Sequence, residues 1–133
     1  MDDEETKSPA EFVRHVAVNF VSRGYFFYVT GEIPAHKDPA ATDAKIVRQY
    51  RTDISKWTRY RQRRRGCAAV QYLRHGHRFV LLATHGAHRF FQDEASVVRD
   101  LRQQPLMLFG YSIKYRDGGH RSHVLVRRVS IRP

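Results

Sequence analysis

The sequence predicts a single α+β domain in which helices pack on a mostly antiparallel, five-stranded sheet. The length of 133 residues is that of one ordinary domain, and 41% of the residues are apolar, which is enough for one modest core. Apolar residues recur at helical spacing in some segments and form short β-branched or aromatic runs in others. These segments follow the order αβααββαββ. We expect residues 1–8 to form a flexible acidic tail and residues 9–133 to form the domain.

Helical periodicity is clearest near the start of the chain. Phe12, Val16 and Phe20 recur at four-residue spacing, and Gly24 stands where a helix C-terminal cap is expected. Later helices are expected to begin at the capping carboxylates Asp38 and Asp53. The predicted helices cover residues 9–22, 39–50, 54–65 and 93–103.

Strands are predicted where β-branched and aromatic residues gather between turn signals. The run Phe-Val-Leu-Leu-Ala within residues 78–84 is apolar on both faces, which is typical of a central strand. The short connection around Gly76 indicates a hairpin with the strand before it, and Gly118-Gly119 indicates a second hairpin at the end of the chain. The predicted strands cover residues 25–33, 67–73, 78–84, 106–116 and 120–131.

Positive charge is the most informative feature of the composition. The chain has 24 Lys and Arg against 13 Asp and Glu, and five of these acids lie within the first eleven residues. Residues 12–133 therefore carry a formal charge of +15. Of the 24 bases 19 are Arg, whose planar guanidinium can grip a phosphate with two hydrogen bonds. This balance favours a polyanionic partner, and a generally solubilising surface is the alternative.

The third predicted helix carries the densest run of bases. We expect Ile54, Trp57 and Tyr60 to face the core and the bases to form an exposed edge. Like charges at helical spacing repel one another unless an anion lies against them, although bases near a helix C-terminus also gain from its dipole. With one nearby base, the expected nucleic-acid contacts in this part of the chain are Lys56, Arg59, Arg61, Arg63, Arg64, Arg65 and Arg74.

The terminal hairpin supplies a second basic surface. A Gly118-Gly119 loop would pair Asp117 with His120 and place Ile113 opposite Val124 on an apolar face. The other face then gathers bases directly across the strands, which is unfavourable without a bound anion. The expected contacts on this face are Lys114, Arg116, Arg121 and Arg127. Together, the basic helix and this sheet face could clamp a strand or follow a duplex backbone.

Histidines near predicted strand ends are candidates for chemistry. His75, His77, His85 and His88, each near an Arg or Tyr, could act as general acid or base in metal-independent RNA cleavage. The His-x-x-His spacings at residues 85–88 and 120–123 could suit a metal. Because they lack nearby Cys partners or a carboxylate pattern, no metal and no cofactor is expected.

Three functions are consistent with these patterns. The leading hypothesis is a nucleic-acid-binding protein, and whether it also cuts its partner stays open. The alternatives are a metal-independent ribonuclease and an adaptor or inhibitor that binds an acidic protein surface. RNA and DNA, single strand and duplex, and monomer and oligomer all stay open. A single cysteine excludes an internal disulfide, and no apolar run approaches the ~20 residues of a membrane span. The acidic start is unlike a secretory signal, so a cytoplasmic location without membrane contact is expected.

Overall fold

The structure, a computed structural model, describes residues 8–118 and 121–129 and forms them into helices and antiparallel strands. The helical elements are α1 (Pro9–Asn19), the 3-10 turn η2 (Val21–Arg23), α2 (Pro39–Tyr50), α3 (Lys56–Arg64) and α4 (Phe90–Asp93). The strands are β1 (Phe27–Glu32), β2 (Val70–His75), β3 (Arg78–Ala83), β4 (Arg99–Asp100), β5 (Leu106–Leu108), β6 (Tyr111–Gly118) and β7 (Arg121–Arg128). Residues 1–7 of the expected acidic tail lie outside the described residues.

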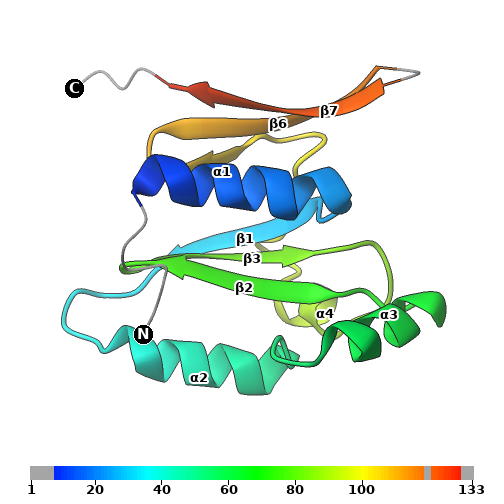
Figure 1. The fold of residues 1–133 in the computed structure, drawn as a ribbon. Coiled ribbons are helices and arrows are strands. Elements are labelled where there is room, and N and C mark those ends of the chain that lie inside the picture. The colour runs from blue at the N-terminus through cyan, green and yellow to red at the C-terminus, as the bar shows by residue number, and fades with distance from the viewer. Residues whose placement is uncertain (1–7, 119–120, 130–133) are drawn as a thin grey trace.

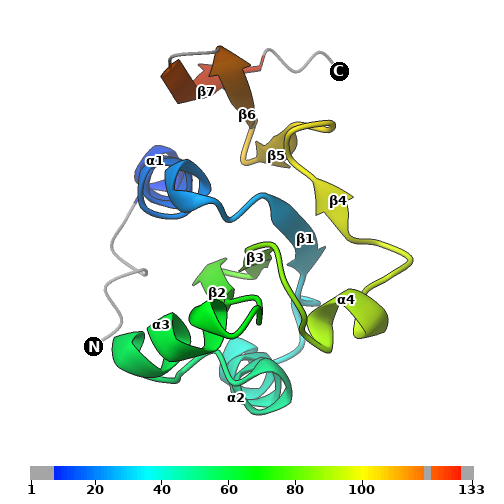
Figure 2. The ribbon, with the colours of Figure 1, turned by 90° about the vertical axis from the view of Figure 1, so that its right-hand side faces the viewer.

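Helix α1 lies between two sheets (Figure 1). One sheet has the order β2-β3-β1-β4 and the other the order β5-β6-β7. The α+β class is therefore as the sequence predicts, but the strands form two antiparallel sheets and not the single five-stranded sheet expected. Helices α2 and α4 lie on the face of the four-stranded sheet opposite α1, and α3 lies near its β2 edge (Figure 2). None of the described helices is long and apolar enough to cross a membrane.

The sequence explains why α1 can occupy the middle layer. Ser8 caps the helix through a reciprocal capping box with Glu11, and Pro9 takes the first helical position. Phe12, Val13 and other apolar side chains of α1 are buried in a core shared by both sheets. The helix ends at Asn19, before the expected residue 22, and η2 continues to a left-handed glycine at residue 24.

The core of the four-stranded sheet agrees with the predicted central strand. β3 pairs with β1 on one side and β2 on the other, so both of its neighbours are strands. Val80 and Leu82 pack toward α1, while Leu81 and Ala83 pack into a second cluster with α2 and α4. As expected, β2 and β3 form a hairpin, whose turn contains Gly76 at φ +63°. One edge strand of this sheet is β2. At the other edge β4 is only two residues long, so it covers only a short part of β1.

The predicted helix over residues 93–103 is wrong. Only Phe90–Asp93 form a helical turn, and the segment that follows adds β4 to the free edge of β1. The Leu101 backbone N–H donates to the Phe26 carbonyl at 2.7 Å, and the Leu101 side chain is buried. Pairing with β1 and burial of Leu101 thus replace the helix that Val97, Val98 and Leu101 suggested in the sequence.

The expected strand over residues 106–116 is broken into two. Phe109 and Gly110 both have positive φ, at 49° and 79°, and they form the two-residue turn between β5 and β6. The ring of Phe109 packs against Phe12 and His75, at centroid distances of 6.0 and 5.3 Å. These contacts accompany a backbone conformation that a bulky residue rarely adopts, which explains why the turn was missed.

The terminal hairpin has its predicted faces but not its predicted pairs. Ile113 pairs with Val126 and Arg116 with His123, a displacement of two residues from the expected register. Because side chains alternate with a period of two, a shift of two residues leaves every side chain on the expected face. The last described pair of the hairpin is Gly118 with Arg121, and part of the predicted Gly118-Gly119 loop lies outside the described residues.

Candidate functional site

An open groove between the end of α1 and helix α3 is lined by four bases. It has a volume of about 420 Å³ and crosses the β2 edge of the four-stranded sheet. Bases and aromatic residues dominate its lining, which contains no acid. The lining residues of this α1–α3 groove are Asn19, Phe20, Arg23, Tyr25, Lys56, Arg59, Tyr60, Arg63 and Gln71.

Local interactions, and not core packing, shape α3. Ser55 caps the helix by accepting a hydrogen bond from the Thr58 backbone N–H at 3.1 Å, whereas the sequence suggested Asp53 as the cap. The guanidinium of Arg59 donates to the Ile54 carbonyl at 2.6 Å. None of the helix residues is buried. The helix therefore stands at the surface with its side chains available to a partner.

The bases of α3 lack carboxylate neighbours. No acid occurs in residues 54–66, and no ion pair among the described residues joins a base of α3 to a carboxylate. Arg59 and Arg63 are four residues apart, as are Arg61 and Arg65, and each like-charged pair costs about 0.2–0.5 kcal/mol. The helix dipole offsets part of this cost. An anion in the groove would relieve the rest.

Two large aromatic side chains on α3 are exposed, which corrects the expectation that they face the core. Trp57 is 70% exposed and Tyr60 is 52% exposed. The helical spacing of Trp57 and Tyr60 is as the sequence predicts. However, no apolar layer of the described structure covers the face of α3 that carries them. The guanidinium of Arg64 lies 5.8 Å from the centre of the Tyr60 ring and donates to its hydroxyl at 3.1 Å. Tyr60 also lines the groove.

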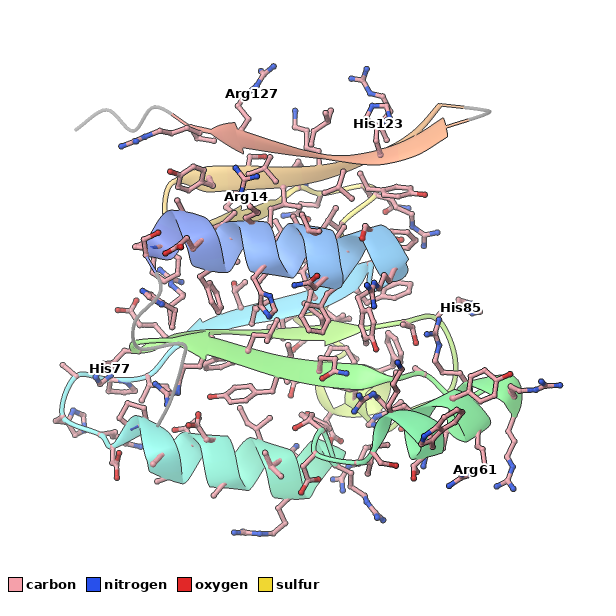
Figure 3. All side chains as sticks on the ribbon, in the orientation of Figure 1. Arg14, Arg61, His77, His85, His123 and Arg127 are labelled. Carbon is pink, nitrogen blue, oxygen red and sulfur yellow. The ribbon has the colours of Figure 1, made fainter. Side chains whose placement is uncertain are left out.

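The expected contacts on and near α3 divide into three groups. Lys56, Arg59 and Arg63 line the groove. Arg74 is only 9% exposed and makes a bidentate ion pair with Asp43, so its guanidinium is committed to the fold and does not extend the basic surface. The remaining bases are exposed outside the groove, as Figure 3 shows for Arg61, and they are Arg61, Arg64 and Arg65.

The hairpin face is basic, but its side chains point away from the groove. Lys114, Arg116 and Arg127 are exposed, and a hollow of about 290 Å³ runs along them. The side chain of Arg121 lies outside the described residues. Figure 3 shows His123 and Arg127 pointing away from α1, which lies with the four-stranded sheet between this face and α3. The two basic surfaces therefore do not face one another as a clamp would.

The candidate catalytic histidines do not form one cluster. His75 and His77 lie at the β2–β3 turn, whereas His85 and His88 follow the opposite end of β3, as Figure 3 shows for His77 and His85. A six-residue strand separates the two pairs by roughly 20 Å. His75 packs its ring against Phe12 at a centroid distance of 5.5 Å.

His88 belongs to a polar network that joins α2 to α4. Its Nδ1 accepts the Phe90 backbone N–H at 3.0 Å, and burial lowers its pKa below the ordinary value of 6.5. The Tyr50 hydroxyl donates to Glu94, and burial raises the pKa of Tyr50. These contacts hold the two helices together, and a neutral His88 is the form that fits them.

Sequence reasoning missed the α1 side of the groove. Arg23, Phe20 and Tyr25 line it, yet the sequence places Phe20 in a predicted helix, Tyr25 in a predicted strand and Arg23 in neither. A base beside Gly24 was the one available signal, because the glycine marks the place where the chain turns and exposes its neighbours. A second hollow of about 300 Å³, on the side of α3 that includes Gln62, is lined by Arg48, Arg51 and Arg89 among others.

Neither metal ligation nor similarity to known proteins points to another site. Within residues 8–118 and 121–129, no group of three or more His, Cys, Asp or Glu side chains is placed to hold a metal ion. No protein-family model, curated protein sequence or solved structure matches the chain. The α1–α3 groove is therefore identified from its own geometry and charge.

Proposed function

We propose that the protein binds nucleic acid in the α1–α3 groove, chiefly through the phosphate backbone. The observation that carries this proposal is the groove lining, in which Arg23, Lys56, Arg59 and Arg63 occur with no acid. Phosphates placed there would neutralise bases that otherwise repel one another, and they would release counterions from the nucleic acid.

The extent of the basic surface favours a polymer over a small anion. Helix α3 is nine residues long, or about 13 Å, and carries exposed bases both inside and outside the groove. A single phosphate could engage only part of this surface. Aromatic residues lie between the basic residues, and nucleobases can stack on them, whereas simple polyanions cannot.

A salt titration of affinity, made with a matched pair of variants, tests the proposal. The double variant Lys56→Gln/Arg63→Gln removes two groove charges while keeping Arg59, whose guanidinium also holds the Ile54 carbonyl. The double variant Lys114→Gln/Arg127→Gln removes the same charge from the hairpin face. Each lost phosphate contact lowers the slope of log K against log salt by about 0.7–0.9. We expect the groove variant to lose about 1.4–1.8 in slope and the hairpin variant to change less.

The outcomes separate the three hypotheses. Equal losses in both variants, or a loss confined to the hairpin variant, would remove the groove as the principal site. The probes are examined on a denaturing gel in excess chelator after the titration, and cleaved RNA would instead support the metal-independent ribonuclease. Retention by an acidic protein with no affinity for nucleic acid would support the adaptor.

A further inference from the structure

The side chain of Trp57 is the most exposed large apolar group of the described residues. An indole is costly to leave in water, and α3 itself does nothing to cover it because the helix has no buried residue. Its neighbours along the chain include the bases Lys56 and Arg59. A planar apolar group that also carries negative charge would match both the ring and these bases.

The surroundings of the two aromatic rings of α3 differ. The rings of Trp57 and Tyr60 meet edge to face, with centroids 6.4 Å apart and planes inclined at 83°. The guanidinium of Arg64 lies over the Tyr60 ring, whereas none of the cation–π contacts in the described part of the chain involves Trp57. A planar group can therefore stack on Trp57 more readily than on Tyr60.

We propose that Trp57, whose ring contacts the groove-lining Tyr60 although it does not itself line the groove, stacks on an unpaired nucleobase. The ligand class of the groove is then single-stranded nucleic acid. This inference rests on the function proposed above. In a duplex each base has both faces covered by its neighbours in the stack, whereas a single strand can offer a base face to an aromatic side chain.

The alternation of residue types along α3 fits this ligand better than a protein. A single strand presents a phosphate and a nucleobase in every nucleotide. Helix α3 presents a pair of cations, Lys56 and Arg59, and beside it a pair of aromatic rings, Trp57 and Tyr60, with the members of each pair three residues apart along the chain. A protein surface would need several carboxylates spaced around an apolar pocket to match the same helix. That partner is the competing outcome of the test below.

Trp57 is the one tryptophan of the chain, so its fluorescence reports directly on the ring. The purified protein is titrated with an oligouridylate of about twelve nucleotides, with a blunt RNA hairpin of the same phosphate number whose paired strands are joined by a non-nucleotide linker, and with inorganic polyphosphate. We expect the single strand to quench the emission strongly, and the hairpin and the polyphosphate to bind with little quenching. Equal quenching by all three ligands would overturn the stacking contact.

Variants separate stacking from charge. Trp57→Ala should weaken oligouridylate binding about 5- to 100-fold without changing the salt slope, because it removes no phosphate contact. Trp57→Phe should restore much of the affinity, since a ring is retained. Met107→Ala removes a side chain of comparable exposure on β5 and should leave binding unchanged. Thermal unfolding of each variant checks that the fold persists.

The results distinguish failure of stacking from failure of the proposed function. If Trp57→Ala leaves oligouridylate affinity unchanged, or weakens hairpin RNA as much as the single strand, stacking is refuted while nucleic-acid binding stands. If no nucleic acid binds the unaltered protein and an acidic protein does, both proposals are refuted. Quenching of the unaltered protein by the single strand, together with an affinity that falls in Trp57→Ala and is largely regained in Trp57→Phe, supports the inference.

Discussion

Removing the carboxylate of Asp43 should destabilise the fold by breaking a network that joins α2 to β2. This carboxylate accepts hydrogen bonds from Arg74 Nε and Nη2, both at 2.8 Å, and from the Tyr72 hydroxyl at 2.5 Å. Arg74 Nη1 also donates to the Gly76 carbonyl at 2.7 Å. In Asp43→Asn the guanidinium of Arg74 would stay buried but would lose the negative charge of this carboxylate.

The expected loss of stability follows from how far each side chain of the ion pair is buried. Removing one partner of a fully buried pair costs about 3–5 kcal/mol. The side chain of Asp43 is 31% exposed, so water can partly replace it, and we expect a loss of about 2–3 kcal/mol. For a chain of this length, the corresponding decrease in Tm is on the order of 10 °C.

Urea unfolding followed by far-ultraviolet circular dichroism measures this loss, because Trp57 is too exposed to report on the core. Tyr72→Phe should cost only about 1 kcal/mol, since it removes one hydrogen bond. Asp53→Asn is the control, because that acid is exposed. If Asp43→Asn loses no more stability than Asp53→Asn, the network does not stabilise the fold as argued.

Two further predictions concern packing and pH. Gly31→Ala should lower the free energy of unfolding in urea by about 1–2 kcal/mol, because an added Cβ would lie 2.3 Å from Cζ of the Phe79 ring. Phe79→Leu in the same chain should remove most of that penalty. Equal penalties with Phe79 and with Leu at this position would contradict the prediction. His88 should make the fold less stable below about pH 6.5, because burial lowers its pKa in the folded state and protons then bind the unfolded chain preferentially. The free-energy difference between the unaltered protein and His88→Gln should therefore shrink as pH falls from about 7.5 to 5.5, and parallel pH profiles would count against this role.

Local patterns in the sequence predicted what local interactions determine. The start of α1, the Gly76 hairpin and the interior position of β3 depend on caps, turn residues and continuous apolar runs, and all three are present in the structure. The faces of the terminal hairpin also follow from alternation alone, which is why they hold although the register is displaced by two residues.

Features that depend on distant neighbours were not predictable in the same way. Helical periodicity shows that Trp57 and Tyr60 lie near one another, but it does not show whether another layer covers them. The groove combines side chains from α1, η2, α3 and β2, and no sequence motif connects these segments. The sequence suggests that Arg74 is a surface base, because its ion-pair partner Asp43 is 31 residues distant along the chain.

A residue-by-residue map of the protein surface that contacts nucleic acid tests the central proposal most directly. Backbone amide chemical shifts of the isotopically labelled protein are followed by NMR as a short single-stranded oligonucleotide is added at moderate salt. We predict that the largest changes cluster at residues 19–25 and 55–66, on the two sides of the α1–α3 groove, and include the indole N–H of Trp57. Changes confined to residues 111–128 of the terminal hairpin, or none at saturating oligonucleotide, would contradict the groove as the nucleic-acid interface.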